Sequence, residues 1–254
     1  MKEKEEETFS NLFNDAITVD IKGWDFSYVE GRMILEHPPW DYRKVILPFI
    51  KESTCMLDMG TGGGEFLSTL KPLPKVTYAT EAYLPNIPIA RKRLNNFGVK
   101  LIPVTKHEEL PLANDFFDLI INRHEEYCPQ EVYRILKPQG IFITQQVGQF
   151  DNIELNQFFG DETYKEWKWD LKFASKQLKT YGLDILDSNE TLINEYFKDV
   201  GAVVFYLRMI SWQLPDFNIH ENISKFKELH SKIQKEGQFT THGHRFLIIA
   251  KKER

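Results

Sequence analysis

A glycine-rich turn between an apolar strand and a helix is the feature that most constrains this chain. Cys55–Leu57 is apolar, residues 58–64 read Asp-Met-Gly-Thr-Gly-Gly-Gly, and Glu65–Leu70 has helical character. Glycine is needed where the backbone takes positive φ values or must let a ligand approach closely. A strand, a glycine turn and a helix in this order predict a nucleotide-type cofactor site in an α/β sheet.

The spacing of the glycines excludes two common versions of such a site. A dinucleotide site reads G-x-G-x-x-G, and counting from Gly60 and Gly62 places Glu65 where the third glycine should stand. A P-loop requires Gly-Lys-Ser/Thr after the turn, and that sequence is missing. An NAD-linked enzyme therefore remains only as an outside alternative.

Composition limits the size of the fold and the class of partner. The chain has 254 residues, of which 42% are hydrophobic, enough for one substantial core with an appended lid. Its formal net charge is −5, which disfavours nucleic acid as a partner without excluding it. The two cysteines, Cys55 and Cys128, do not form a C-x-x-C motif, so neither structural zinc nor a disulfide framework is expected.

Neither a signal sequence nor an apolar run of membrane-spanning length is recognisable in the sequence. We therefore expect a cytoplasmic protein without membrane contact, and the sequence leaves the oligomeric state open. The first seven residues are strongly charged, which is typical of a frayed chain end.

Apolar, β-rich segments alternate with helical stretches, which predicts βαβ units and a parallel sheet. The candidate strands are residues 54–59, 76–80, 99–104, 117–122, 140–146, 201–209 and 245–250. Pro111 interrupts the stretch between the third and fourth strands, so a loop is expected there in place of a crossover helix. The last strand is expected to insert antiparallel beside residues 201–209.

Two aromatic-rich stretches lie outside this alternation. Residues 8–50 hold Trp24 and Trp40 among other aromatics, and residues 151–190 carry Trp167 and Trp169 amid alternating charges. We expect both to cover the sheet edge at which ligands bind, although aromatics that simply pack on the core are an equally good interpretation.

The spacing Asp-x-Gly-x-Gly-x-Gly resembles the first motif of class I S-adenosylmethionine-dependent methyltransferases. Glu81, after the strand 76–80, and Arg134–Gly140, which is similar to the family's Leu-Lys-Pro-Gly-Gly stretch, extend the resemblance. It implies a Rossmann-like, mostly parallel sheet of seven strands with the last strand antiparallel and helices on both faces. The corresponding domain organisation is a cap segment, 1–50, and a methyltransferase domain, 51–254, with a lid insertion near 151–190.

The resemblance also implies which residues bind S-adenosylmethionine. Glu81 would accept hydrogen bonds from the ribose hydroxyls, and the glycine turn would wrap the amino acid part. Lys106-His107 stands where the family often has Asp and a small residue, so main-chain groups of His107 or the side chain of Glu108 are expected at the adenine. The expected cofactor-binding residues are Asp58, Gly60, Thr61, Gly62, Glu81, Ala82, His107, Glu108, Asn122 and Arg123.

The resemblance implies methyl transfer by in-line displacement, for which positioning is the main requirement. A general base is needed only if the acceptor keeps its proton at neutral pH, and His124, which follows the fourth strand, is the candidate. A ring that only caps or lines the pocket is the alternative role for His124.

We expect the methyl acceptor to be a small molecule. Residues 121–148 faintly resemble ribosomal-RNA guanine methyltransferases, but the zinc-binding cysteines of those enzymes are missing, and residues 122–125 lack the prolines of amino-methylating DNA enzymes. An rRNA or tRNA methyltransferase and a catalytically silent cofactor-binding regulator remain as alternatives.

Other chemistry-bearing patterns have simpler interpretations. Glu125-Glu126 are sequence neighbours that do not share one face of an element, so a paired acid/base site is not expected. His242-Gly243-His244 lacks a third metal ligand nearby and is typical of a turn into the last strand. We therefore expect no metal. Cys128 precedes a proline and lacks a partner base, so it is not expected to be a nucleophile.

Overall fold

Strand β2, Cys55–Met59, is buried along its whole length, and its side chains alternate between two hydrophobic clusters. Leu57 packs with residues of the helices α5, Pro129–Ile135, and α7, Leu171–Thr180. Met56 packs with residues of the helices α2, Tyr42–Glu52, α3, Glu65–Thr69, and α4, Asn86–Leu94. Because successive side chains of a strand point to opposite faces, helices cover both faces of the sheet around β2.

The computed structural model describes residues 2–21 and 23–253, and these fall into two units. The first comprises the described residues of Met1–His37, Gln149–Lys168 and Leu192–His244. The second comprises those of Pro38–Gly148, Trp169–Thr191 and Arg245–Arg254. Strands β7, Leu183–Phe197, and β8, Phe239–Lys252, contribute residues to both units.

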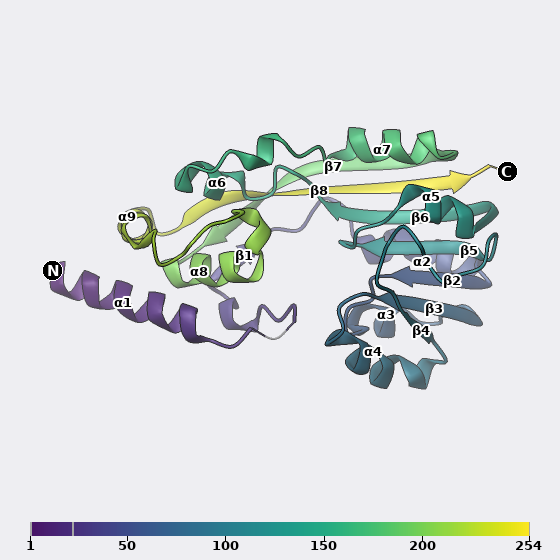
Figure 1. The fold of residues 1–254 in the computed structure, drawn as a ribbon, viewed down its shortest axis with the longest axis horizontal. Helices are drawn as coiled ribbons and strands as arrows, with labels where there is room; N and C mark the ends of the chain where they lie inside the picture. The colour runs from purple at the N-terminus through teal and green to yellow at the C-terminus, as the bar shows by residue number, and fades with distance from the viewer. Residues whose placement is uncertain (1, 22, 254) are drawn as a thin grey trace. The chain divides into compact units, whose positions relative to one another are not determined.

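The strands form one sheet in the order β1-β7-β8-β6-β5-β2-β3-β4 (Figure 1). Their bounds are β1 Met33–Leu35, β2 Cys55–Met59, β3 Val76–Glu81, β4 Lys100–Pro103, β5 Phe117–Arg123, β6 Leu136–Val147, β7 Leu183–Phe197 and β8 Phe239–Lys252. Neighbours among β2 to β6 pair in parallel, whereas β8 pairs antiparallel with β6, and β1 antiparallel with β7. The carboxyl ends of β2, β3 and β5 therefore meet at one edge.

Helices connect and flank these strands. The α-helices are α1 Lys2–Thr18, α2 Tyr42–Glu52, α3 Glu65–Thr69, α4 Asn86–Leu94, α5 Pro129–Ile135, α6 Ile153–Phe159, α7 Leu171–Thr180, α8 Val200–Met209 and α9 Ile223–Glu236. The short 3₁₀ helices are η1 Ser27–Val29, η2 Asn95–Phe97, η3 Thr163–Lys165 and η4 Ser211–Gln213. None of the helices in the described part of the chain combines the length and the apolar character that a membrane span requires.

Within the described residues the sheet has eight strands, so the prediction of seven was wrong. Residues 201–209 were expected as a strand but form helix α8, whose first turn is capped by Asp199 through the amide of Ala202 at 2.9 Å. Almost all of α8 is buried. A fully buried apolar run has no polar face, so periodicity cannot distinguish a helix from a strand there. The strand that follows β8 in the sheet order is β7 instead.

The other predicted strands exist. The first four agree to within one residue at each end, whereas β6 and β8 begin four and six residues earlier than predicted. The antiparallel last strand is confirmed by the pairing of β8 with β6. The segment between β4 and β5 contains no helix, as Pro111 predicted. Glu131 and Arg134 of α5 hold this loop. Glu131 accepts the amide of Leu110 at 2.7 Å, and Arg134 donates to the carbonyl of Leu112 at 2.7 Å.

The two aromatic-rich stretches are not confirmed as lids. Residues 151–190 contain α6, η3, α7 and the start of β7. Within the second unit, Trp169, Ala174 and Leu178 pack in the same hydrophobic cluster as Phe246. Part of this stretch is thus core of the second unit, because α7 buries its apolar face against the sheet.

Candidate functional site

The glycine turn after β2 has the backbone geometry that requires glycine. Gly60, Gly62 and Gly64 have φ values of +69°, +62° and +79°, a region that side chains disfavour. The turn is fixed to strand β3 by two hydrogen bonds to Thr80. The amide of Thr61 donates to the Thr80 carbonyl at 2.9 Å, and the amide of Gly60 donates to its hydroxyl at 3.3 Å.

The space above the turn differs from one glycine to the next. A Cβ built on Gly62 would have no atom within 4 Å, whereas one built on Gly60 would lie 2.3 Å from Cγ of Glu125. Arg93 of α4 bonds both the carbonyl of Gly63 and the carboxylate of Glu65. The turn is therefore open at Gly62 and covered by a side chain at Gly60.

Two buried carboxylates stand at the ends of the neighbouring strands β2 and β3. Asp58 is 6% exposed and Glu81 is 5% exposed. Burial, with a contribution from the charge of Glu81, raises the pKa of Asp58 to about 7. Glu81 Oε1 accepts the amide of Tyr83 at 2.8 Å, and within the described residues its Oε2 has no hydrogen bond.

Asn122, at the end of β5, lies inside the protein. It is fully buried, and its Oδ1 accepts hydrogen bonds from Thr144 Oγ1 at 2.8 Å and from Gln146 Nε2 at 2.6 Å. Its Nδ2 donates to the carbonyl of Glu125 at 3.1 Å. The Asn122 side chain therefore fixes the loop after β5 and is not directed at a ligand.

Arg123 and His124 continue this loop on its exposed side. The Arg123 guanidinium lies 4.4 Å from the centre of the Phe66 ring. His124 has a φ of +62°, and its Nε2 lies 3.0 Å from Nε2 of Gln145, whose Oε1 accepts the indole N–H of Trp40 at 2.8 Å. Because Oε1 is used by Trp40, the Gln145 amide donates to the histidine ring.

The His124 ring is reached by water but is flanked densely by protein atoms. This loss of hydration, together with the charges of Arg245 and Arg123, lowers the pKa of His124 to about 3. The ring is therefore neutral across the physiological range.

The remaining predicted cofactor residues have different surroundings. His107 is half-buried, and its Nε2 lies 3.4 Å from Oε1 of Glu125. Glu108 is exposed, and Ala82 packs on the edge of a hydrophobic cluster. His107 thus lies near the covered side of the turn through Glu125.

Sequence reasoning missed Glu125. Its carboxylate is half-buried, and burial, followed by the charges of Glu81, Glu126 and Asp58, raises its pKa to about 7. The signal that could have found it is its position, two residues after a parallel strand that ends beside the glycine turn. A carboxylate with a perturbed pKa beside a cofactor-type loop is a candidate functional group.

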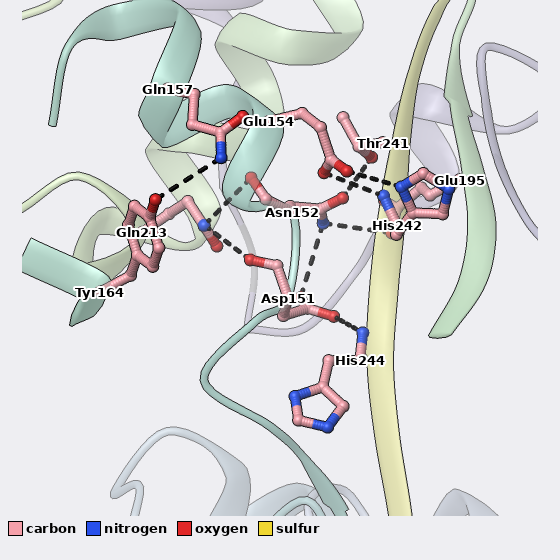
Figure 2. Close-up of polar contacts among 10 residues, drawn as sticks. All are labelled: Asp151, Asn152, Glu154, Gln157, Tyr164, Glu195, Gln213, Thr241, His242 and His244. Carbon is pink, nitrogen blue, oxygen red and sulfur yellow. Dashed lines mark hydrogen bonds and ion pairs between the residues drawn. The ribbon is translucent and has the colours of Figure 1, made fainter. Parts of the chain in front are cut away.

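His242 and His244 have separate partners in the first unit. Figure 2 shows the His242 ring against Glu154, with Nδ1 2.5 Å from Oε1, and the amide of His244 donating to Asp151 at 2.8 Å. The Nδ1 atom of His244 accepts the amide of Phe150 at 3.2 Å. Among residues 2–21 and 23–253, no group of three or more His, Cys, Asp or Glu side chains could hold a metal ion.

Residues 57–144 match the family model described as a methyltransferase domain. This match includes Asp58, the glycine turn, Glu81 and the loop after β5. No curated protein matches the chain.

Several solved structures share the fold. A provisionally assigned methyltransferase of Bacillus halodurans is 14% identical, with a TM-score of 0.58 over 84% of this chain and 99% of that one. A protein of unknown function from Deinococcus radiodurans is 13% identical, with a TM-score of 0.60 over 87% and 90% of the two chains. Phosphoethanolamine N-methyltransferase 2 of Haemonchus contortus is 15% identical, with a TM-score of 0.51 over 85% and 53%.

Sequence identities this low support a shared fold and nothing more. The family match, in contrast, covers the strands and turns that form the candidate site. Residues 57–144 are therefore similar to the methyltransferase domain, a family that uses S-adenosylmethionine as the methyl donor.

Proposed function

We propose that this protein transfers the methyl group of S-adenosylmethionine to a small-molecule acceptor at the carboxyl ends of β2, β3 and β5. The observation that carries the proposal is the glycine turn, which is left-handed at three glycines, open at Gly62 and flanked by the buried carboxylates of Asp58 and Glu81. Ligands of open α/β sheets bind at this edge of the strands.

The chemistry of the surrounding residues fits this cofactor. When bound, S-adenosylmethionine supplies an electrophilic methyl group on a positively charged sulfur. The free Oε2 of Glu81 is available to accept hydrogen bonds from ribose hydroxyls, while its Oε1 stays on the amide of Tyr83. The open face of Gly62 lets a ligand approach the backbone, and Asp58 adds a carboxylate suited to a cation.

The base role predicted for His124 is not supported by the surroundings of its ring. Nε2 already accepts from Gln145, and a pKa of about 3 makes the ring a weak base. We therefore propose that His124 is a neutral positioning residue that shapes the loop between Arg123 and Glu125. Gln145 holds its ring, and Trp40 in turn fixes Gln145. An acceptor that reaches the site with its nucleophilic atom already unprotonated requires no base.

Charge supports a small acceptor over RNA. The chain has a formal net charge of −5, and the negative charges of Glu81, Glu126 and Asp58 all act on Glu125 beside the glycine turn. A phosphate backbone would meet repulsion there. The Haemonchus contortus protein binds phosphomonomethylethanolamine with S-adenosylhomocysteine, so a fold of this kind can accommodate a small amine acceptor.

The experiment that tests the proposal offers the purified protein S-adenosylmethionine with an isotopically labelled methyl group. Parallel reactions receive a small-metabolite extract or total RNA, and the labelled product is separated by chromatography. We expect label in the small-molecule fraction. Label in RNA alone would establish the alternative acceptor, and cofactor binding without transfer to either fraction would indicate a catalytically silent regulator.

A further inference from the structure

We propose that Glu125 recognises the positive charge of the cofactor sulfur, so that S-adenosylmethionine binds more tightly than its uncharged-sulfur product, S-adenosylhomocysteine. This inference rests on the proposed function, because it assigns a specificity role within the same cofactor site. The sulfonium is the only charge that the two molecules do not share, which makes their comparison a direct test.

The backbone of Glu125 is held in place by two amide side chains. Its carbonyl accepts hydrogen bonds from Nδ2 of Asn122 at 3.1 Å and from Nε2 of Gln146 at 3.0 Å. Asn122 and Gln146 are both buried and also bond each other. This framework presents the Glu125 side chain in one direction, so its position is a consequence of the fold.

The Glu125 side chain points toward the glycine turn. A Cβ on Gly60 would lie 2.3 Å from Cγ and 2.6 Å from Oε2 of Glu125, so the carboxylate lies directly over the backbone of the first glycine. Only a residue without a side chain leaves room for it there. Gly62, two residues further, has open space above it. The carboxylate therefore borders the open part of the turn.

A second observation at the turn points to a ligand. Thr61, between the two glycines, is 8% exposed; its hydroxyl acts on the Asp58 carboxylate but makes no hydrogen bond of normal geometry within the described residues. A buried polar atom without a partner costs free energy, and such atoms in native proteins call for an explanation. A polar ligand in the turn supplies the missing partner for Thr61 Oγ1.

The charged groups around Glu125 favour a cation. Glu81 and Asp58, from the ends of β3 and β2, and the adjacent Glu126 act on it with negative charge. His107, from the loop after β4, lies 3.4 Å from Oε1. The positive charge of Arg123 lowers the pKa of Asp58 but is not among the main causes of the pKa shift of Glu125. Three carboxylates therefore surround a group that is itself a carboxyl.

The consequence is a pH-dependent preference. Burial and these charges raise the pKa of Glu125 to about 7, so without ligand it is about half protonated at neutral pH. A cation favours the carboxylate and lowers this pKa, so its binding releases a proton. Below pH 7 the proton must first be removed, and affinity for a cation therefore increases as pH rises. Between pH 6 and pH 8 the expected increase is about tenfold.

The test measures binding of S-adenosylmethionine and S-adenosylhomocysteine by titration calorimetry at pH 6, 7 and 8. For the wild-type protein we expect affinity for the methylated cofactor to rise about tenfold over this range, and affinity for the product to change less than twofold. At pH 7, two buffers with different ionisation enthalpies will show about half a proton released with the methylated cofactor only.

Two variants separate the roles of the neighbouring carboxylates. Glu125→Gln is expected to remove the pH dependence and to weaken the methylated cofactor about tenfold at pH 8, with product affinity unchanged. Unchanged product binding also shows that the variant is folded. Glu126→Gln, at an exposed neighbour that does not cover Gly60, is the matched control. It should keep the preference for the methylated cofactor, with the pH dependence moved to lower pH because one of the charges that raise the pKa of Glu125 is removed.

Each outcome decides between the proposals. Equal weakening of both ligands in Glu125→Gln, or pH dependence that persists in it, would overturn the role of Glu125 and leave the proposed function standing. If the wild-type protein binds neither molecule, the proposed function itself fails. Binding of both with an equal pH dependence would assign the titrating group to a charge that the two molecules share, and would also overturn the inference.

Discussion

Replacement of Asp58 by asparagine is expected to stabilise the ligand-free protein at alkaline pH. Asp58 is 6% exposed, and burial is the main cause that raises its pKa from 3.8 to about 7. In the unfolded chain the same carboxyl ionises near its ordinary value. The folded state therefore holds its proton more tightly than the unfolded state between about pH 4 and pH 7, and stability falls as pH rises through this window.

The size of the change in the free energy of unfolding follows from the difference between the pKa values of Asp58 in the folded and unfolded states. About three pKa units correspond to about 4 kcal/mol of destabilisation at pH 8, and about 2 kcal/mol at pH 5, where the unfolded carboxyl is already ionised. Asp58→Asn keeps the shape and removes the charge, at a cost of about 1 kcal/mol for altered hydrogen bonding. The net stabilisation is therefore expected to grow by about 2–3 kcal/mol from pH 5 to pH 8.

Urea denaturation of both proteins at pH 5, 6, 7 and 8, without ligand, measures this difference. Asp118→Asn is the control of opposite sign. Burial alone would raise the pKa of Asp118, but hydrogen bonds from Thr54 and Cys55 overcome it and lower the pKa. This variant should lose stability by a constant amount over the same range. A stability difference for Asp58→Asn that is independent of pH would refute the reasoning.

Three further variants test other parts of the site. Glu81→Ala should weaken S-adenosylmethionine at least tenfold in calorimetry, since hydrogen bonds to a charged group contribute about 1.5–3 kcal/mol each; unchanged affinity would discard the ribose role. His124→Asn should keep kcat within about threefold at pH 7 once the labelling screen has identified an acceptor, because a ring with a pKa of about 3 is a weak base; a hundredfold loss of kcat at constant KM would restore the base role. Asn122→Ala should lower the free energy of unfolding in urea by about 2–4 kcal/mol, because Thr144 and Gln146 lose a buried acceptor; a loss below about 0.5 kcal/mol would contradict the assigned network.

Local features of the site could be predicted from the sequence because their causes are local. Positive φ values at Gly60, Gly62 and Gly64 follow from glycine itself, and the strand before them follows from an apolar run that ends at Asp58. The parallel order of the strands around the turn follows from alternation of strands and helices. The family resemblance rested on the same short spacing, and the match over residues 57–144 confirms it.

Helix α8 and strand β1 could not be predicted from the sequence because both depend on tertiary structure. Residues 201–209 are apolar except for Arg208, and their packing within the core of the first unit selects a helix. In a fully buried segment neither the helical period nor the strand period appears in the sequence. Strand β1 is only three residues long and is defined by its pairing with β7, which lies more than 150 residues away.

The character of the candidate site was also decided in three dimensions. In the sequence, Glu125 is one of two adjacent acidic residues with no evident role. The fold holds its carbonyl with Asn122 and Gln146 and places its carboxylate over Gly60, which is 65 residues earlier in the chain. A pKa depends on burial and on charges brought close by folding. The glycine turn can therefore be predicted from the sequence, whereas the carboxylates around it come close together only when the chain folds and the strand ends meet.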